Sequence, residues 1–110
     1  RGYEAMQALA RSDFAAAEAA LRELLRDSPA DLHVLEALGG LLLRVDRAAE
    51  AVPFLAGAVE AHAGNESVRY LLGKALLCSG QEAAAMQVWR EALVLFPHSG
   101  RIAAAVRGPG

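Results

Sequence analysis

The side chains that could carry metal or nucleophilic chemistry are few and scattered in this sequence. Its three histidines are His33, His62 and His98, and no pair of them has the spacing of a zinc or metalloprotease site. The single cysteine, Cys78, has no second thiol with which to bind a metal or to form an intrachain disulfide. These residues are therefore interpreted as ordinary side chains rather than as ligands or nucleophiles.

A Gly-Lys pair at Gly73-Lys74 is the other candidate, because such a pair ends a phosphate-binding loop. The preceding Gly64 stands at the wrong spacing and no Ser or Thr follows the lysine, so the signature fails. The acidic residues are better explained as parts of solvated helix faces than as catalytic groups. Glu18, for example, precedes Arg22 by four positions, in the orientation that favours a helical ion pair. We therefore predict that the protein is not an enzyme and has no cofactor and no metal.

The composition indicates helices and argues against several classes of partner. The chain holds 25 Ala and 17 Leu but only eight Val, one Ile and no Thr, a bias towards helix and away from sheet. Its formal net charge is -2 and it has no run of Lys or Arg, so no nucleic-acid partner is expected. No apolar run approaches the roughly 20 residues that span a bilayer, so no membrane insertion is expected. A cytoplasmic location is expected, with the periplasm as the alternative, because one cysteine does not fix the redox compartment.

Start and stop signals predict an all-α chain of about seven antiparallel helices. We expect Asp31, Asn65 and Ser99 to cap the helices that follow them, because their side chains accept hydrogen bonds from free N–H groups. Asp46 is expected to cap a helix that begins at residue 47, and a turn at Ser12-Asp13 to separate the first two helices. The expected ranges are 2–10, 14–27, 32–45, 47–62, 66–79, 81–96 and 100–107.

The sequence repeats with a period of 34 residues. A pair of amphipathic helices cannot cover its own apolar stripes, so neighbouring pairs must stack. Gly39 and Gly73 fall inside helices, where they are expected to let the second helix of each pair approach closely at an alanine, while Leu55 and Trp89 fill space towards the next unit. The shift superposes the following residues: Leu38-Gly39 on Leu72-Gly73, Leu42 on Leu76, Ala51 on Ala85, and Leu55 on Trp89.

These residues resemble the tetratricopeptide repeat (TPR) family, whose pattern joins a Leu-Gly pair in one helix to an Ala, an aromatic and a closing Pro around the next. Three departures occur: Arg69 stands at an aromatic position, Ala63 at a Pro position, and Glu4-Ala5 where the first unit would have Leu-Gly. The best-matching unit carries these motif residues: Leu72, Gly73, Leu76, Ala85, Trp89 and Pro97.

The resemblance covers essentially the whole chain and implies one domain with a right-handed α-α superhelix. It implies about three repeats and the start of a fourth helix pair. The expected boundaries are a partial repeat at 1–30, repeats at 31–64 and 65–98, and a terminal helix at 99–107. Gly108-Pro109-Gly110 is expected to end that helix.

The resemblance also implies a function, that of a scaffold holding a peptide or helical segment of another protein in a concave groove. A chaperone-type carboxylate clamp, made of Lys and Asn, is not expected, because Gly40 and Met6 stand at the Asn positions. An alternative is that Leu9, Leu43 and Leu77 only pack between helices. The register of the family gives these candidate partner-binding residues: Met6, Leu9, His33, Glu36, Leu43, Arg44, Tyr70, Lys74, Leu77 and Arg101.

Two other functions stay open at this point. The sequence has no initiator Met and stops inside a fourth unit, which would suit a non-catalytic TPR domain of a larger enzyme, such as a sulfotransferase or glycosyltransferase. The unfinished unit is also expected to leave the side of Val88 and Trp89 under-covered. Such an end could stack on another copy and make a homo-oligomer through the terminal repeat.

Overall fold

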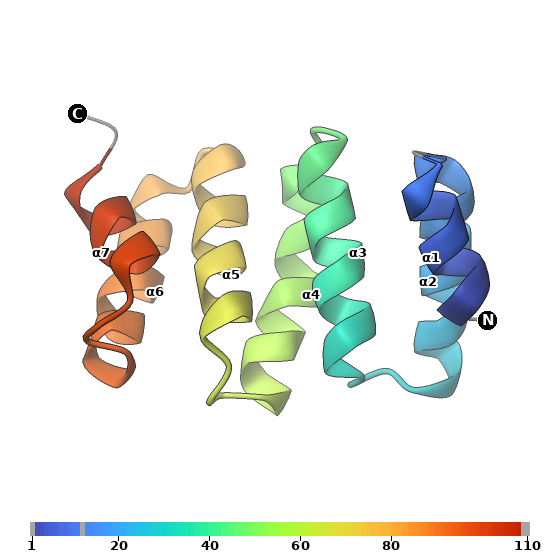
Figure 1. The fold of residues 1–110 in the computed structure, drawn as a ribbon. Coiled ribbons are helices and arrows are strands. Elements are labelled where there is room, and N and C mark those ends of the chain that lie inside the picture. Colours follow the sequence, from blue (N-terminus) through green and yellow to red (C-terminus); the bar gives the residue numbers. More distant parts are fainter. Residues whose placement is uncertain (1, 12, 109–110) are drawn as a thin grey trace.

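The computed structural model describes residues 2–11 and 13–108, which form seven α-helices and no strand (Figure 1). Each helix packs on its neighbours in sequence, and α3 also contacts α5. The result is an elongated stack of helix pairs measuring 38 × 26 × 20 Å. The helices are α1 (Gly2–Ala10), α2 (Phe14–Asp27), α3 (Leu32–Arg44), α4 (Ala48–Ala61), α5 (Glu66–Cys78), α6 (Glu82–Leu95) and α7 (Gly100–Arg107).

The predicted helices are confirmed, with ends that differ by no more than one residue. Asp31, Asn65 and Ser99 cap α3, α5 and α7 as expected, each accepting the backbone N–H three residues ahead at 3.2, 2.9 and 3.3 Å. Asp13 does the same for α2 at 3.1 Å. Ser12 and the predicted stop at residues 109–110 lie outside the described residues. The caps show that short-range chemistry sets where each helix pair begins.

The prediction that Asp46 caps α4 is wrong. The N-cap is Arg47, which makes no side-chain cap hydrogen bond, and Asp46 instead has a left-handed φ of 64°. The Arg47 N–H donates to the Leu42 carbonyl at 2.8 Å, so Asp46 is the left-handed residue that closes the end of α3. Gly80, with φ 87°, closes α5 in the same way. Asp46 therefore ends one helix rather than beginning the next, a conformation that Asp tolerates better than most residues.

The helical glycines make room for large side chains of the second helix in each pair. A Cβ built on Gly39 would lie 2.5 Å from Leu55 Cδ2, and one built on Gly73 would overlap the Trp89 indole. The Trp89 Nε1–H also donates to the Tyr70 carbonyl at 3.1 Å. Leu55 and Trp89 thus fill the spaces that the glycines leave within their own helix pairs. Trp89 also lies beside residues of α7, the helix that begins the next unit.

Ion pairs join the first helix pair to the second at the flank of the stack. Arg47 Nη1 lies 2.6 Å from Glu18 Oε1, and Arg47 Nε lies 2.6 Å from Glu50 Oε2. The predicted pair of Arg22 with Glu18 is present at 2.9 Å. Hydrogen bonds from Arg47 and then from Arg22 hold the pKa of Glu18 below its ordinary value, and Arg47 does the same to the pKa of Glu50. The carboxylates are therefore structural ties between α2 and α4.

Candidate protein-binding groove

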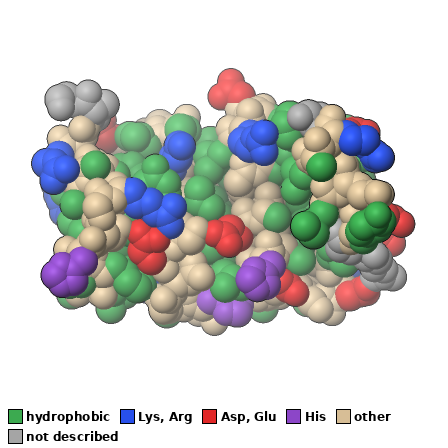
Figure 2. Space-filling model, viewed as in Figure 1, with side chains coloured by type: hydrophobic (Ala, Val, Ile, Leu, Met, Phe, Trp, Pro, Cys, Tyr) green, Lys and Arg blue, Asp and Glu red, His purple; other side chains and the backbone are tan. Residues whose placement is uncertain are grey.

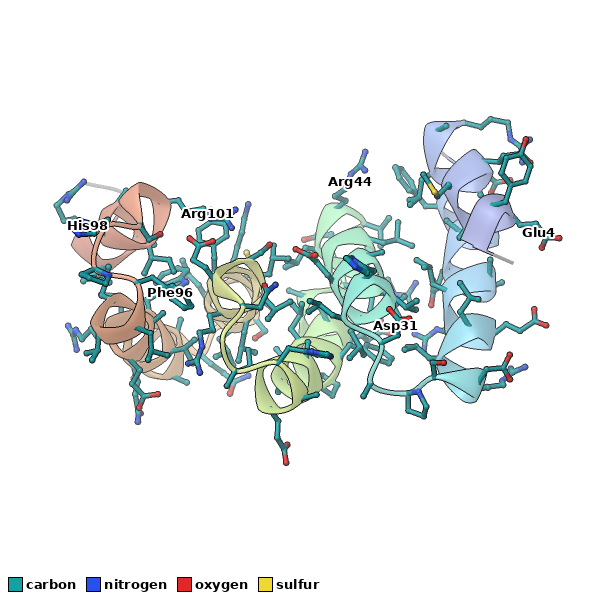
Figure 3. The ribbon with its side chains drawn as sticks, turned by 60° about the horizontal axis from the view of Figure 1, so that its bottom comes forward. Glu4, Asp31, Arg44, Phe96, His98 and Arg101 are labelled. Carbon is teal, nitrogen blue, oxygen red and sulfur yellow. The ribbon has the colours of Figure 1, made fainter. Side chains whose placement is uncertain are left out.

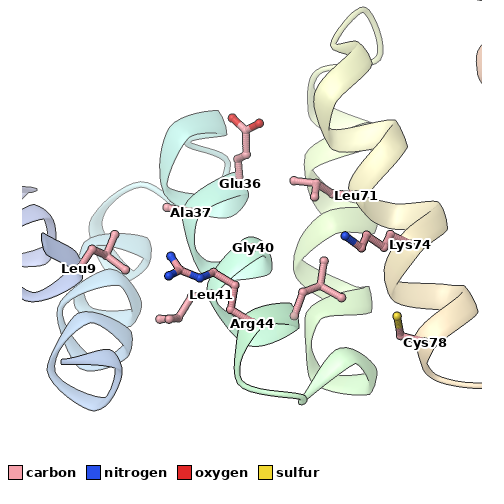
Figure 4. Close-up of a pocket in the computed structure, with 10 residues that line it drawn as sticks. Leu9, Glu36, Ala37, Gly40, Leu41, Arg44, Leu71, Lys74 and Cys78 are labelled. Atoms are coloured by element: carbon pink, nitrogen blue, oxygen red, sulfur yellow. The ribbon is translucent and has the colours of Figure 1, made fainter. Parts of the chain in front are cut away.

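A groove of about 500 Å³ crosses the face that α1, α3 and α5 present (Figure 4). Leucines and an alanine form its floor, and charged groups from α3 and α5 stand at its edges. Figure 2 shows hydrophobic side chains gathered between the helices of this face. The residues that line the groove are Leu9, Glu36, Ala37, Gly40, Leu41, Leu43, Arg44, Leu71, Lys74 and Cys78.

A second hollow of about 360 Å³ continues the same face between α5 and α7. Its wall includes the Tyr70 ring, which stacks on Trp89 at 6.4 Å between centroids. Residues of α7 and the Gly108 that follows it form one side of this hollow. The residues that line it are Tyr70, Leu77, Trp89, Arg101, Ala104, Ala105 and Gly108.

The two hollows bring together most of the predicted partner-binding residues. Met6 and His33 line neither hollow, although both are exposed. That any of these side chains binds a partner stays a prediction. The predicted residues in the first hollow are Leu9, Glu36, Leu43, Arg44 and Lys74, and those in the second are Tyr70, Leu77 and Arg101.

The leucines of this face serve packing as well as the groove. Leu9 and Leu43 are half-buried and pack against the core, whereas Leu77 is 39% exposed. Leu71 and Ala37 also line the groove but were not predicted. Leu71 follows Ala37 by the 34-residue period, so applying the repeat register to this position would have found both.

Two of the predicted charged residues, Arg101 and Glu36, already have hydrogen-bond partners within the chain. Arg101 donates from Nε to Glu66 at 3.0 Å and its guanidinium lies 4.7 Å from the Tyr70 ring centroid (Figure 3). This hydrogen bond lowers the pKa of Glu66. Glu36 accepts a hydrogen bond from the Ser67 hydroxyl. This end of the face is therefore electrostatically balanced.

Arg44 and Lys74 are different, because neither forms an ion pair or a side-chain hydrogen bond with residues 2–11 or 13–108. Arg44 lies at the opposite end of α3 from Asp31 (Figure 3), and its guanidinium sits 4.9 Å from the Phe14 ring centroid. In Figure 4 the Lys74 amine points from α5 into the groove. The groove thus has two exposed cations over an apolar floor.

The terminal repeat is better covered than predicted. Trp89 is only 3% exposed, so the expectation of an under-covered surface there is wrong. The Gly73 space accounts for its burial. The exposed apolar side chains near this end are instead Val94 and Leu95 of α6, at 81% and 54%.

Other kinds of site find less support in the described residues. No group of three or more His, Cys, Asp and Glu side chains in residues 2–11 and 13–108 is arranged to hold a metal ion. None of the helices in the same ranges is long and apolar enough to cross a membrane.

Solved structures of the same architecture cover nearly all of this chain. MamA MSR-1 matches 93% of it with a TM-score of 0.82 and 27% identity, and the chain spans 59% of that protein. An O-GlcNAc transferase from Thermobaculum terrenum matches 94% of it with a TM-score of 0.78 and 29% identity, over 20% of the transferase. The first TPR of Spaghetti (RPAP3), bound to the HSP90 peptide SRMEEVD, matches 96% with a TM-score of 0.86 over 83% of its length. Its 13% identity makes this a likeness of fold alone.

Sequence comparison adds the family. No curated protein matches the chain. The model of the bacterial transcriptional activator domain (BTAD) matches residues 5–96, a segment that includes α2 to α6 entirely. The helix pairs, their period and their structural neighbours are those of TPR proteins. The chain therefore belongs to the bacterial transcriptional activator domain family, and its fold is a TPR solenoid.

Proposed function

We infer that this domain is a protein-interaction scaffold, which holds a peptide or helical segment of another protein in the groove of α1, α3 and α5. One observation carries the inference: an apolar floor open to solvent, edged by two cations that form no ion pair in the described residues. Such a surface suits an amphipathic segment that covers the apolar floor. The TPR that is bound to an HSP90 peptide supports the capacity of this fold for such a role.

The family description supports a setting for this role, namely a bacterial transcriptional activator. The net charge of -2 makes contact with protein a better proposal than contact with nucleic acid. A cytoplasmic location follows from the same setting, because bacterial transcription takes place there. Cell fractionation checks the location, and recovery of the protein in the periplasmic fraction would contradict it.

A second candidate is that the chain is the non-catalytic repeat domain of a larger enzyme. The observation that favours it is the match to an O-GlcNAc transferase, 29% identical over 94% of this chain. The full reading frame separates the two settings. A transferase domain encoded with this chain would favour the enzyme, and a DNA-binding domain would favour the activator.

Blocking the groove without removing any core side chain tests the scaffold role. A Cβ added at Gly40 meets nothing within 4 Å, and Gly40 lines the groove. Gly40→Gln should therefore fill the groove and keep the fold. We expect the wild-type domain to capture a protein from the native cell lysate. The Gly40→Gln variant should capture at least about tenfold less of that protein.

The matched control is Gly57→Gln in α4, because Gly57 also has free space around its Cβ but does not line the groove. Both variants should melt at or above the wild-type temperature, since Gln favours helix more than Gly does. If Gly40→Gln is folded and captures the same proteins as Gly57→Gln, the groove is not the binding site.

A further inference from the structure

Charged side chains at one end of the groove face have partners within the chain, whereas those at the other end form no ion pair with the part of the chain that the structure describes. At the end near the starts of α3, α5 and α7, Glu36 accepts from Ser67 and Arg101 pairs with Glu66. At the other end, Arg44 and Lys74 have no anionic partner in the described residues. Inside the groove itself one carboxylate, already hydrogen-bonded, faces two cations. The groove is thus locally basic in a chain whose formal net charge is -2.

Arg44 is held in a position that leaves its donors free. Its guanidinium lies over the Phe14 ring at 4.9 Å from the centroid. A contact with an aromatic face uses the plane of the guanidinium, while the N–H groups point outward along its edges. Those edges can bind a carboxylate through two parallel hydrogen bonds. The contact with Phe14 therefore leaves the N–H groups of Arg44 available to an anion.

Lys74 supplies a second positive charge on the opposite wall. It is exposed on α5 and points into the groove (Figure 4). The leucines between the two cations carry no hydrogen-bonding group that would suit a free inorganic anion. An apolar strip with one cation on each wall matches instead a polypeptide that alternates apolar and acidic side chains.

We propose that the occupant of the groove is an acidic amphipathic segment of a partner protein. Its apolar side chains contact Leu9, Leu43 and Leu71, and its carboxylates pair with Arg44 and Lys74. This inference rests on the proposed scaffold function and adds the chemistry of the partner. A chain-terminal carboxylate is not the proposed ligand, because Gly40 has no side-chain amide that could clamp one.

The test uses three short amphipathic peptides with amidated C-termini and leucines along one helical face. They carry Glu, Gln or Lys at the positions beside the leucines. Fluorescence anisotropy with the whole domain should give tightest binding for the Glu peptide, weaker by about tenfold for the Gln peptide, and none for the Lys peptide. Affinity for the Glu peptide should fall as salt is raised.

The charge-reversed variant Arg44→Glu/Lys74→Glu should invert the order of affinities. Its affinity for the Glu peptide should fall by at least about tenfold, and it should bind the Lys peptide. Its matched control is Arg26→Glu/Arg90→Glu, which makes the same change of net charge on α2 and α6, away from the groove. In the control the order of peptides should stay as in the wild type. Amide chemical shifts should place the Glu peptide on α1, α3 and α5.

Equal affinity for the Glu and Gln peptides would overturn the acidic-partner inference while leaving the scaffold function intact. The same holds if Arg44→Glu/Lys74→Glu and its control change the affinity equally. Binding of a phosphate ion or of a second copy of the chain to the groove, without binding of the Glu peptide, would also overturn it. If no peptide binds and Gly40→Gln still captures the wild-type partners, the groove is not the binding site, and the proposed function of holding a partner in it is wrong.

Discussion

At Gly73 the missing side chain is what allows the Trp89 indole to lie against α5. The same arrangement recurs at Gly39 with Leu55 in the preceding pair. Gly costs helix stability of about 1 kcal/mol relative to Ala, so its presence at two equivalent positions needs a packing reason. The buried tryptophan, which also donates to the Tyr70 carbonyl, supplies that reason at Gly73.

Substitution of the two kinds of helical glycine should have opposite effects. Gly73→Ala places a Cβ inside the rigid indole of Trp89 and should destabilise the fold by about 1 to 3 kcal/mol. Gly73→Leu should cost more for the same reason. Chemical denaturation monitored by helical circular dichroism measures the difference in the free energy of unfolding.

The control is Gly40→Ala, where the added Cβ meets nothing within 4 Å. That variant should be more stable than wild type by about 0.5 to 1 kcal/mol, the gain in helix propensity. A Gly73→Ala protein as stable as Gly40→Ala would show that Trp89 can move aside at no cost.

Residue-scale contacts were predictable where they are local in sequence. The caps at Asp31, Asn65 and Ser99 and the pair of Glu18 with Arg22 follow from spacings of three and four. The bond of Arg47 to Glu18 could not be foreseen, because the two residues are 29 positions apart and meet only when α2 and α4 stack. The contact of the Arg44 guanidinium with the Phe14 ring could not be predicted for the same reason, because the two residues are far apart in the sequence.

At the scale of elements, the starts and the ends of the helices are defined by different features. Side-chain caps begin α3, α5 and α7, whereas left-handed residues end α3 and α5. The sequence signal for Asp46 was real but ambiguous, since Asp favours both a helix start and a left-handed turn. The 34-residue period resolves it, because Gly80 occupies the equivalent position.

The ion pairs between α2 and α4 predict how stability depends on pH. Arg47 lowers the pKa of Glu18 and of Glu50 from the ordinary 4.5. A carboxyl group whose pKa is lower in the folded state stabilises the fold above its ordinary value, and this contribution is lost as the pH falls through the folded pKa. The melting temperature should therefore drop below about pH 4.5, and Arg47→Gln should reduce the drop.

Arg26→Gln is the control for this experiment, because Arg26 forms no ion pair in the described residues. The melting temperature of Arg26→Gln should fall with decreasing pH as steeply as that of the wild type. The Arg47 effect should shrink in high salt, since the Arg47 and Glu50 side chains are 37% and 50% exposed. Identical profiles for wild type and Arg47→Gln would show that the ion pairs do not stabilise the fold.

At the scale of the whole molecule, the stack has contacts between neighbours and few beyond them. The helix contacts join successive helices, with α3 to α5 as the further step. Stability in such a chain is close to a sum of repeat and interface contributions. The two ends, α1 and α7, pack on one side only.

Native-state hydrogen exchange should therefore be graded along the chain. Backbone amides of α1 and α7 should exchange fastest, and those of α4 and α5 slowest, because the inner helices have neighbours on both sides. Mass spectrometry of exchanged peptides measures the gradient. Uniform protection from α1 to α7 would mean that the solenoid opens as a single cooperative unit.

The architecture of the whole was more predictable than its binding surface. Helix number, order and stacking follow from periodicity and from the 34-residue repeat. Which charges in the groove are left without partners depends on the distances between helices of different repeats. Arg101 and Arg44 were equal candidates in the sequence, and they differ because the fold brings Glu66 of α5 beside Arg101.

The position of Cys78 has a practical consequence for handling this protein. It is the single cysteine of the sequence, is exposed, and lies at the edge of the groove. A thiol-reactive dye would therefore attach at Cys78 alone and report directly on the binding of a ligand in the groove. In buffers without a reductant the same thiol can join two molecules covalently, groove to groove. Dimers that a reductant separates would be products of air oxidation, with both grooves closed to other ligands.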